Sequence, residues 1–518
     1  MALTRAGTPG AGGVGPGSAG AGSVLVVDVG TSSVRTAVVD AGGRVGRVHQ
    51  APLVTATPAP GMVELDASAL ATTVCELAAA TLADAGPVQG VGIANQRSTT
   101  VVWERSSGRP VAPAVGWQDL RTVLTCLTLQ AEGIRLAPNM SATKVAAILD
   151  EVDPDRRRDG ELCFGTLDSW IAWTLAGGSD RPGGGLHVTD ATNAGVTGLV
   201  APGGGGRWDQ WDRRVLEALR IPEAMLPRIV DTVGVVAPCT ALPGAPTLAA
   251  LCGDQQASLV GQGCTLPGTA KATFGTGGML DLCTGADPPT HAGRGPAGTF
   301  PVVAWQQAGR ATWGVEAMML TAGACVQWLS EDLGLIPDPA SSAEVAAACE
   351  RSGDVWFVPA LLGMGTPVWD FGARGALLGV TRGTGRPEVV RAVLEGVAHR
   401  GADLLESAEA DGAGTVASLR VDGGMSANPV FVQALADACG RPVDLSPELE
   451  ATTRGAGILA GLALGTWDGM AAVADAYRPR ASVAPRLSES DRQALRARWL
   501  DARDRAARTI PELSGIEF

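Results

Sequence analysis

The sequence is short of the residues that build metal and disulfide sites. Only four histidines occur among its 518 residues, and no two of its ten cysteines form a Cys-X-X-Cys pair. Zinc sites usually need closely spaced ligands of these types, so a zinc site is not expected. The scattered cysteines favour reduced, mostly buried thiols in a cytosolic protein over a disulfide framework.

Long apolar runs and positive charge are scarce as well. No stretch of about 18 apolar residues is free of charges or helix breakers, so the sequence predicts no membrane span. The net charge of −13 opposes binding to nucleic acid. Residues 1–22 are rich in Gly, Ala and Pro and lack the apolar centre of a signal peptide, so we expect a disordered tail there. Lysine occurs only twice, at Lys144 and Lys271, and both lie inside the motifs described below.

The chain has enough apolar sequence for two large domains. Hydrophobic residues make up 46% of it, and a single core stops growing near roughly 250–300 residues. The first half begins with predicted strands at 23–29, 35–40 and 44–50, and a similar series restarts with strands at 269–274 and 279–283 and a helix at 316–333. This repetition predicts a duplicated α/β fold, with a cleft between domains 23–262 and 263–518.

Each half opens with two predicted strands joined by a turn of small residues. The first turn, 30–33, is Gly-Thr-Ser-Ser, with Asp28 before it and Arg35 just after it; the second, 275–278, is Gly-Thr-Gly-Gly. Backbone amides and hydroxyls in such turns suit a phosphate, and a carboxylate at Asp28 suits Mg²⁺ held through water. An ordinary hairpin turn is the alternative for each segment alone.

A third glycine-rich segment, 422–428, follows a predicted strand and opens a helix. Its glycines allow close approach of the backbone, and a helix N-terminus favours an anion or the edge of a nucleotide. The alternative is a plain turn in which Ser426 or Asn428 caps the helix. The sequence contains no GxxxxGK[ST] motif, which disfavours a P-loop kinase.

Polar residues at three further predicted strand ends suggest an acceptor site. Asp254 follows the apolar run 247–252 and precedes Gln255, so it could take a proton from an alcohol that the amide orients. Arg97 and Trp117 follow two other strands and could bind the hydroxyls and the carbon face of a polyol. Helix capping by Asp254, a surface ion pair for Arg97 and core packing for Trp117 are the alternatives.

Together these segments resemble the FGGY family of carbohydrate kinases, and within it the glycerol kinases. The similarity spans about residues 24–467 and includes the stretches VLVVDVGTSSVRTAVVD, CGDQQASLVGQG, KATFGTGG and LRVDGGMSANPVFVQALADACGRPV. It implies the duplicated ribonuclease H-like fold of actin-like ATPases. It also implies ATP-dependent, Mg²⁺-assisted phosphorylation of a polyol, in the first place glycerol to sn-glycerol 3-phosphate.

The resemblance assigns roles by position. Asp254 matches the general base and Asp28 the Mg²⁺-associated carboxylate. The acceptor-pocket positions are Arg97, Ser98, Trp117, Asn139, Asp254, Gln255 and Met279. The nucleotide-binding positions are Thr31, Ser32, Ser33, Arg35, Thr276, Gly323, Gln327, Gly424 and Asn428.

Three acceptor positions depart from the glycerol kinase pattern. Ser98 replaces a Glu, Asn139 a Tyr and Met279 an aromatic residue. Because a charge-assisted hydrogen bond is worth roughly 1.5–3 kcal/mol, these changes could weaken glycerol binding ten-fold or more and favour another polyol or ketose. Residues 231–246 also lack the loop that binds fructose 1,6-bisphosphate in some glycerol kinases.

Two readings from other classes stay open on the sequence. One is a non-catalytic nucleotide-binding protein, which the intact Asp28, Thr276 and Asp254 disfavour. The other is an actin-like or chaperone-type ATPase, which the acceptor-pocket residues disfavour. The expected partners are a small polyol and ATP, with no nucleic acid or membrane, and the sequence leaves a homo-oligomer open.

Overall fold

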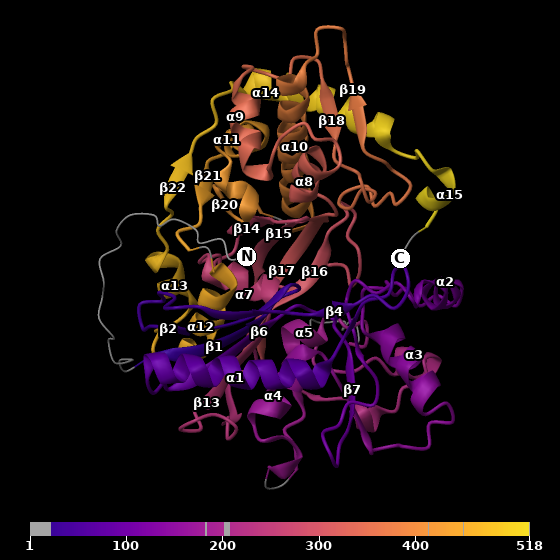
Figure 1. The fold of residues 1–518 in the computed structure, drawn as a ribbon, viewed down its shortest axis with the longest axis vertical. Coiled ribbons are helices and arrows are strands. Elements are labelled where there is room, and N and C mark those ends of the chain that lie inside the picture. The colour runs from indigo at the N-terminus through magenta and orange to yellow at the C-terminus, as the bar shows by residue number, and fades with distance from the viewer. Residues whose placement is uncertain (1–21, 182–183, 201–207, 413, 449, 517–518) are drawn as a thin grey trace, which may run out of the picture.

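One large mixed sheet runs through both halves of the protein (Figure 1). The structure is a computed structural model that describes residues 22–181, 184–200, 208–412, 414–448 and 450–516. The expected tail, apart from Gly22, lies outside these residues. In spatial order the thirteen strands are β22 (Ala481–Val483), β21 (Val443–Leu445), β20 (Leu419–Asp422), β14 (Ala270–Phe274), β15 (Gly278–Gly285), β17 (Arg310–Met319), β16 (Phe300–Gln307), β12 (Val233–Pro238), β13 (Thr247–Gly253), β6 (Gly90–Asn95), β1 (Val24–Val29), β2 (Ser33–Val39) and β3 (His49–Pro52).

The two halves of the sheet have the same topology. In the first, β1, β2 and β3 form an antiparallel meander, and β6 and then β13 add in parallel beside β1. In the second, β14, β15 and β17 form the meander, and β20 and then β21 add in parallel beside β14. This repeated order confirms the duplicated ribonuclease H-like fold. The halves join where β12 pairs with β16 at Val233 and Gln307.

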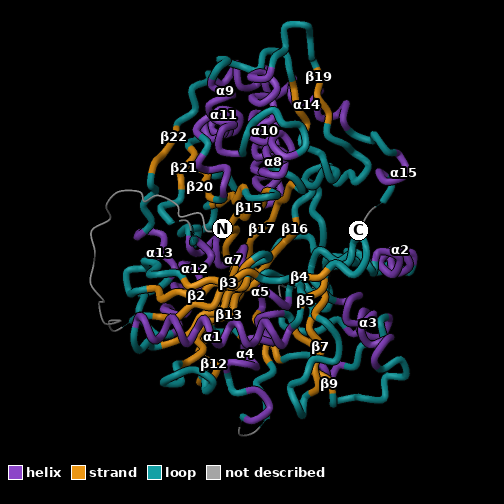
Figure 2. Tube along the Cα trace, in the orientation of Figure 1, coloured by secondary structure: helices purple, strands orange, loops and turns teal. Residues whose placement is uncertain are grey.

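Helices cover the sheet, and Figure 2 shows the strands gathered in the middle with helices outside them. The helices are α1 (Ala67–Ala85), α2 (Val123–Ala131), α3 (Ala142–Val152), α4 (Leu167–Leu175), α5 (Ala191–Ala194), α6 (Arg213–Ala218), α7 (Asp254–Gly261), α8 (Gly323–Glu331), α9 (Ser342–Ala347), α10 (Arg386–Gly412), α11 (Pro429–Cys439), α12 (Ala451–Ala463), α13 (Met470–Ala476), α14 (Glu489–Ala506) and α15 (Pro511–Ser514). Small sheets pair β4 (Thr55–Ala56) and β5 (Glu64–Leu65) with β8 (Ala114–Val115), β7 (Val101–Glu104) with β9 (Leu162–Gly165), β10 (Val188–Asp190) with β11 (Arg228–Val230), and β18 (Trp356–Val358) with β19 (Ala376–Leu378).

Two helices lie between the halves. Helix α7 follows the last parallel strand of the first half, and α12 crosses from the second half of the sequence to pack on α7 and on strands β1, β6 and β13. Their apolar side chains share one buried cluster that includes Ala257, Val260, Ala456 and Ile458. Polar residues at the start of α12 thereby come close to the first phosphate turn.

Two expected boundaries were wrong. The helix expected at 316–333 begins only at Gly323, because residues up to Met319 continue strand β17 against β15. The third strand of the first meander is His49–Pro52 rather than 44–50, since its partners on β2 are residues 33–36. The first of these errors hid a buried carboxylate of the candidate site.

Candidate functional site

The turn after β1 presents hydroxyls above a buried carboxylate. The amide of Gly30 donates to the carbonyl of Ser33 at 3.0 Å and closes the turn. Thr31 and Ser32 are exposed and Ser33 is half-buried, whereas Asp28 is 3% exposed at the end of β1. The turn can therefore offer amides and hydroxyls to an anion while Asp28 stays beneath it.

Asp28 lies close to polar and charged side chains from both halves. Thr453 Oγ1 on α12 donates to its Oδ2 at 3.1 Å. Burial raises the pKa of Asp28 to about 7; the positive charge of Arg35 opposes this rise, and the negative charge of Asp254 adds to it. Arg35 itself forms an ion pair with Glu450, also near the start of α12, at 3.4 Å between Nη1 and Oε2.

The matching turn of the second half is held by helix α8. The carbonyl of Thr276 accepts the amides of Ala322 and Ala324 at 2.8 and 3.1 Å, and the amide of Gly323 donates to the carbonyl of Gly275 at 2.8 Å. A Cβ on Gly323 would lie 2.6 Å from that carbonyl oxygen, so this close approach requires glycine. Thr276 and, one turn along α8, Gln327 are exposed.

The third glycine-rich segment lies beside this turn, because β20 pairs in parallel with β14. Gly423 has φ 86°, and a Cβ on it would lie 2.4 Å from the carbonyl of Phe274. A Cβ on Gly424 would meet no atom within 4 Å, so its backbone faces open space. Asn428 caps α11 by accepting the amides of Val430 and Phe431 at 3.0 and 3.1 Å, which is the capping role weighed above.

Asp254 and Arg97 meet at the same edge of the first half. Asp254 is the first residue of α7, its side chain is 23% exposed, and Oδ1 accepts the amide of Gln255 at 2.8 Å. Arg97 Nε lies 3.8 Å from the same oxygen. Burial raises the pKa of Asp254, while the charges of Arg97 and Lys271 oppose that rise. The arrangement holds a partly desolvated carboxylate beside a cation, which suits a proton acceptor.

Three buried charges of the second half complete this edge. Glu316 Oε2 lies 2.6 Å from Arg97 Nη2. Lys271 Nζ forms an ion pair with Asp281 at 2.8 Å and donates to Gln255 Oε1 at 2.7 Å. Burial raises the pKa of Glu316, and the positive charge of Arg97 opposes that rise. Sequence reasoning gave these three residues no role, although a charged residue inside an apolar strand was a usable signal.

The remaining acceptor positions are less closely gathered. Trp117, 37% exposed, donates from Nε1 to Thr31 Oγ1 at 3.4 Å, so it touches the phosphate turn. Ser98 has φ 62°, and its hydroxyl donates to the carbonyl of Val196 at 3.1 Å. Asn139 is exposed, and Met279 is half-buried on β15. Within the described chain, no hydrogen bond links either of these two side chains to Asp254 or Arg97.

The other lysine of the chain, Lys144, holds the backbone of segments that carry predicted acceptor residues. Lys144 is fully buried, and its Nζ donates to the carbonyls of Gly116, Trp117 and Asn139 at 2.7, 3.1 and 3.4 Å. Burial lowers the pKa of Lys144 to about 7, which Asp119 opposes. Both lysines of the chain thus hold segments that carry predicted acceptor residues.

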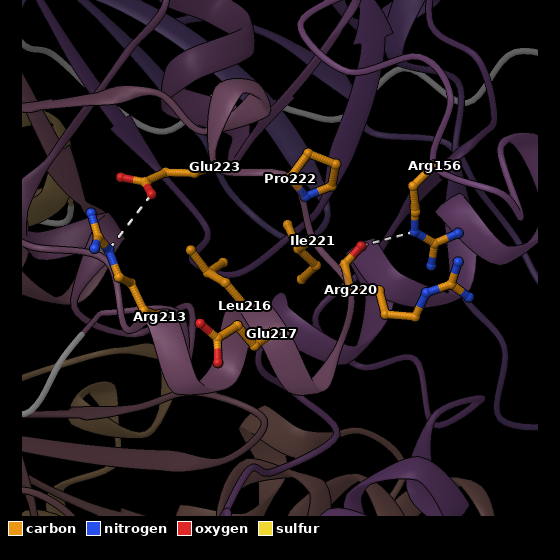
Figure 3. Close-up of a pocket in the computed structure, with 8 residues that line it drawn as sticks. All are labelled: Arg156, Arg213, Leu216, Glu217, Arg220, Ile221, Pro222 and Glu223. Atoms are coloured by element: carbon orange, nitrogen blue, oxygen red, sulfur yellow. Dashed lines mark hydrogen bonds and ion pairs between the residues drawn. The ribbon is translucent and has the colours of Figure 1, made fainter.

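A shallow pocket of about 670 Å³ lies elsewhere, at α6, and Figure 3 shows its lining. It contains none of the predicted site residues. Its arginines are already engaged: Arg156 Nε donates to the carbonyl of Arg220, Arg220 Nη2 donates to the carbonyl of Pro154, and Arg213 pairs with Glu223. We therefore do not take this pocket as the candidate site.

Two structural features are absent from the described residues. In the part of the chain that the structure describes, no helix combines the length and apolar character needed to cross a bilayer. Across the same residues, no three His, Cys, Asp or Glu side chains are grouped as metal ligands.

The duplicated fold, with a Gly-Thr turn in each half and a buried carboxylate beside the first, defines an enzyme of the actin-like ATPase fold. Models of the N- and C-terminal domains of one family match residues 23–261 and 270–464. The chain belongs to the FGGY family of carbohydrate kinases.

Individual relatives agree with this assignment. A glycerol kinase of Aromatoleum aromaticum is 41% identical over 501 residues, 93% of this chain and 98% of that protein. A glycerol kinase of Plasmodium falciparum, solved with ADP, is 25% identical with a TM-score of 0.86 and covers 96% of this chain and 99% of its own. A xylulose kinase of Lactobacillus acidophilus shares the fold, with 19% identity and a TM-score of 0.81 over 95% of this chain and 100% of its own.

Proposed function

We propose that this carbohydrate kinase transfers the terminal phosphoryl group of ATP to glycerol and forms sn-glycerol 3-phosphate. The observation that carries the proposal is the pairing of Asp254 with Arg97 next to the Asp28 turn. The glycerol kinases among its relatives support glycerol as the acceptor. The free cysteines, most of them buried, fit a reducing, cytoplasmic setting.

Asp254 would take the proton of the reacting hydroxyl. Its raised pKa makes it a stronger base than an exposed aspartate, and part of its side chain remains accessible. Arg97 Nη1 is buried and has no hydrogen-bond partner among the described residues, so an acceptor oxygen could receive it. A bound alcohol would thus relieve an unpaired donor, which otherwise costs roughly 1–3 kcal/mol.

The two Gly-Thr turns would hold the nucleotide between the halves, which we assign to residues 23–262 and 263–518. Thr31, Ser32, Ser33 and Arg35 would contact phosphates from one side. Thr276, Gly323, Gln327, Gly424 and Asn428 would contact the nucleotide from the other. The Oδ1 of Asn428 already accepts amides of its helix, and its Nδ2 donates to Ser342 Oγ.

Asp28 fits a role in holding Mg²⁺ through water. Among the described residues, only its Oδ2 receives a side-chain hydrogen bond, from Thr453. A hard cation prefers carboxylate oxygens while keeping several waters. The ion would neutralise negative charge on the phosphates during transfer.

A second candidate is phosphorylation of another polyol or ketose. Ser98 has its hydroxyl occupied by Val196, while Asn139 is exposed and Met279 is half-buried. None of these three supplies the carboxylate, phenol or aromatic ring of the glycerol kinase pattern. This loss of partners for glycerol favours a different polyol or ketose as the acceptor.

An acceptor panel separates the two candidates. We expect glycerol to give the highest kcat/KM among glycerol, erythritol, ribitol, xylulose and ribulose when ADP release is measured with the purified protein. A higher value for any other acceptor would replace glycerol with that compound. ATP binding without turnover on any acceptor would instead support a non-catalytic protein.

The raised pKa of Asp28 predicts a pH-dependent requirement for Mg²⁺. The carboxylate must be ionised to attract the cation, so protonation below its pKa of about 7 competes with the metal. Lowering the pH from 8 to 6 should raise the Mg²⁺ concentration for half-maximal rate about ten-fold. The Asp28→Asn protein should lose this dependence. An unchanged Mg²⁺ requirement in the wild type across this range would argue against the role of Asp28.

A further inference from the structure

Three buried charges form a row across the sheet of the second half. Lys271 on β14 stands directly opposite Asp281 on β15, and Asp281 stands opposite Glu316 on β17. Directly opposed residues place their side chains on the same face of a sheet. Each of the three is at most 4% exposed. Such burial is costly unless every charge is paired, so the partners at the ends of the row matter.

The two ends of the row, Glu316 and Lys271, each contact a residue of the first half that lies next to Asp254. Glu316 pairs with Arg97 at 2.6 Å, and Lys271 donates to Gln255 at 2.7 Å. Arg97 lies 3.8 Å from Asp254, and Gln255 is its neighbour in sequence. The contacts therefore form a ring that starts and ends at the predicted base.

We propose that Glu316 and Lys271 are positioning residues of the acceptor site, which aim the Arg97 guanidinium and the Gln255 amide at an alcohol held against Asp254. The inference rests on the proposed polyol kinase function and adds the part played by the second half. Glu316 occupies the Nη2 side of Arg97, which leaves the buried Nη1 for the acceptor. A purely structural ion pair would not need to contact both Arg97 and Gln255, the two residues beside Asp254.

The test compares isosteric loss of the Glu316 charge with loss of an equally buried charge elsewhere. Glu316→Gln should raise the acceptor KM about ten-fold, because a misaligned Arg97 would lose its charge-assisted hydrogen bond to the acceptor. The ATP KM should change less than about two-fold. Asp403→Asn is the matched control, because Asp403 pairs with Arg400 and both side chains are 1% exposed. The control should lose thermal stability with its acceptor KM unchanged. Glu316→Asp, which keeps the charge, should give an intermediate KM and serves if Glu316→Gln does not fold.

A double variant asks whether Glu316 acts through Arg97. In an Arg97→Lys background, Glu316→Gln should add little to the acceptor KM, because the guanidinium that it orients is already gone. If the two changes multiply, Glu316 acts by another route and the proposal is wrong.

The pH profile supplies a readout that a structural role would not move. Asp254 is faced by Arg97, Lys271, Asp281 and Asp28. Removing the Glu316 charge leaves Arg97 freer to stabilise ionised Asp254, so the acid limb of kcat/KM for the acceptor should move to lower pH, by about one pH unit. A wild-type protein that phosphorylates no polyol would overturn the proposed function itself. An active wild type whose Glu316→Gln variant matches the Asp403→Asn control would overturn only the positioning role.

Discussion

Asp254→Asn should lower kcat about 10²–10⁴-fold, the usual contribution of a positioned general base. The amide has the shape of the carboxylate and cannot take the proton of the attacking hydroxyl. Arg97 would keep its ion pair with Glu316, and the Gln255 amide would keep an oxygen acceptor, so the fold should survive. The Kd for ATP should stay within about two-fold of the wild type, since the predicted phosphate turns are untouched.

Single-turnover rates and ATP titration on the same preparation measure the two quantities separately. Asp411→Asn is a suitable control, because Asp411 also accepts backbone amides, those of Ala297 and Thr299, without belonging to the site. It should retain nearly full kcat. A variant at position 254 that keeps more than about a tenth of kcat would remove Asp254 from the role of base.

The convergence of Asp28, Arg97 and Asp254 was predictable from the sequence. Asp28 lies at the end of β1, whereas Arg97 and Asp254 follow β6 and β13. These three strands are parallel neighbours: Val29 and Gly253 both pair with Asn95 of the central strand β6. Parallel neighbours end at the same edge of a sheet, so residues just beyond them must lie close together. The sequence motifs and the topology therefore point to one site.

The contribution of Glu316 was not predictable in the same way. Residues 313–317 are all buried, so no alternation of polar and apolar side chains distinguishes a strand from a buried helix there. The helix expected at 316–333 therefore includes Glu316, which the structure places on strand β17. The ring through Lys271 and Asp281 depends on cross-strand register, which a single sequence does not reveal.

Gly455→Ala should be strongly destabilising although it lies away from the predicted contacts, because it acts where the two halves meet. A Cβ on Gly455 of α12 would lie 1.8 Å from the carbonyl oxygen of Ala257 on α7, and one on Gly261 would lie 1.9 Å from the carbonyl of Ala451. The obstacle is backbone in both cases, so the helices must move apart. Overpacking costs about 1–3 kcal/mol or more, against a gain of about 1 kcal/mol in helix propensity. We expect Tm to fall by about 5 °C or more.

The same displacement should reach the nucleotide site, because α12 carries Thr453, the hydrogen-bond partner of Asp28. Nucleotide affinity should therefore fall together with Tm. Gly461→Ala on the same helix is the matched control: its Cβ would lie 3.0 Å from the side chain of Trp467, which can shift, so both quantities should stay near the wild-type values. If Gly455→Ala lowers Tm and leaves ATP binding intact, the crossing of α7 and α12 stabilises the fold without setting the geometry around Asp28. If it changes neither, the helices separate at little cost and their close contact is not a constraint on the enzyme.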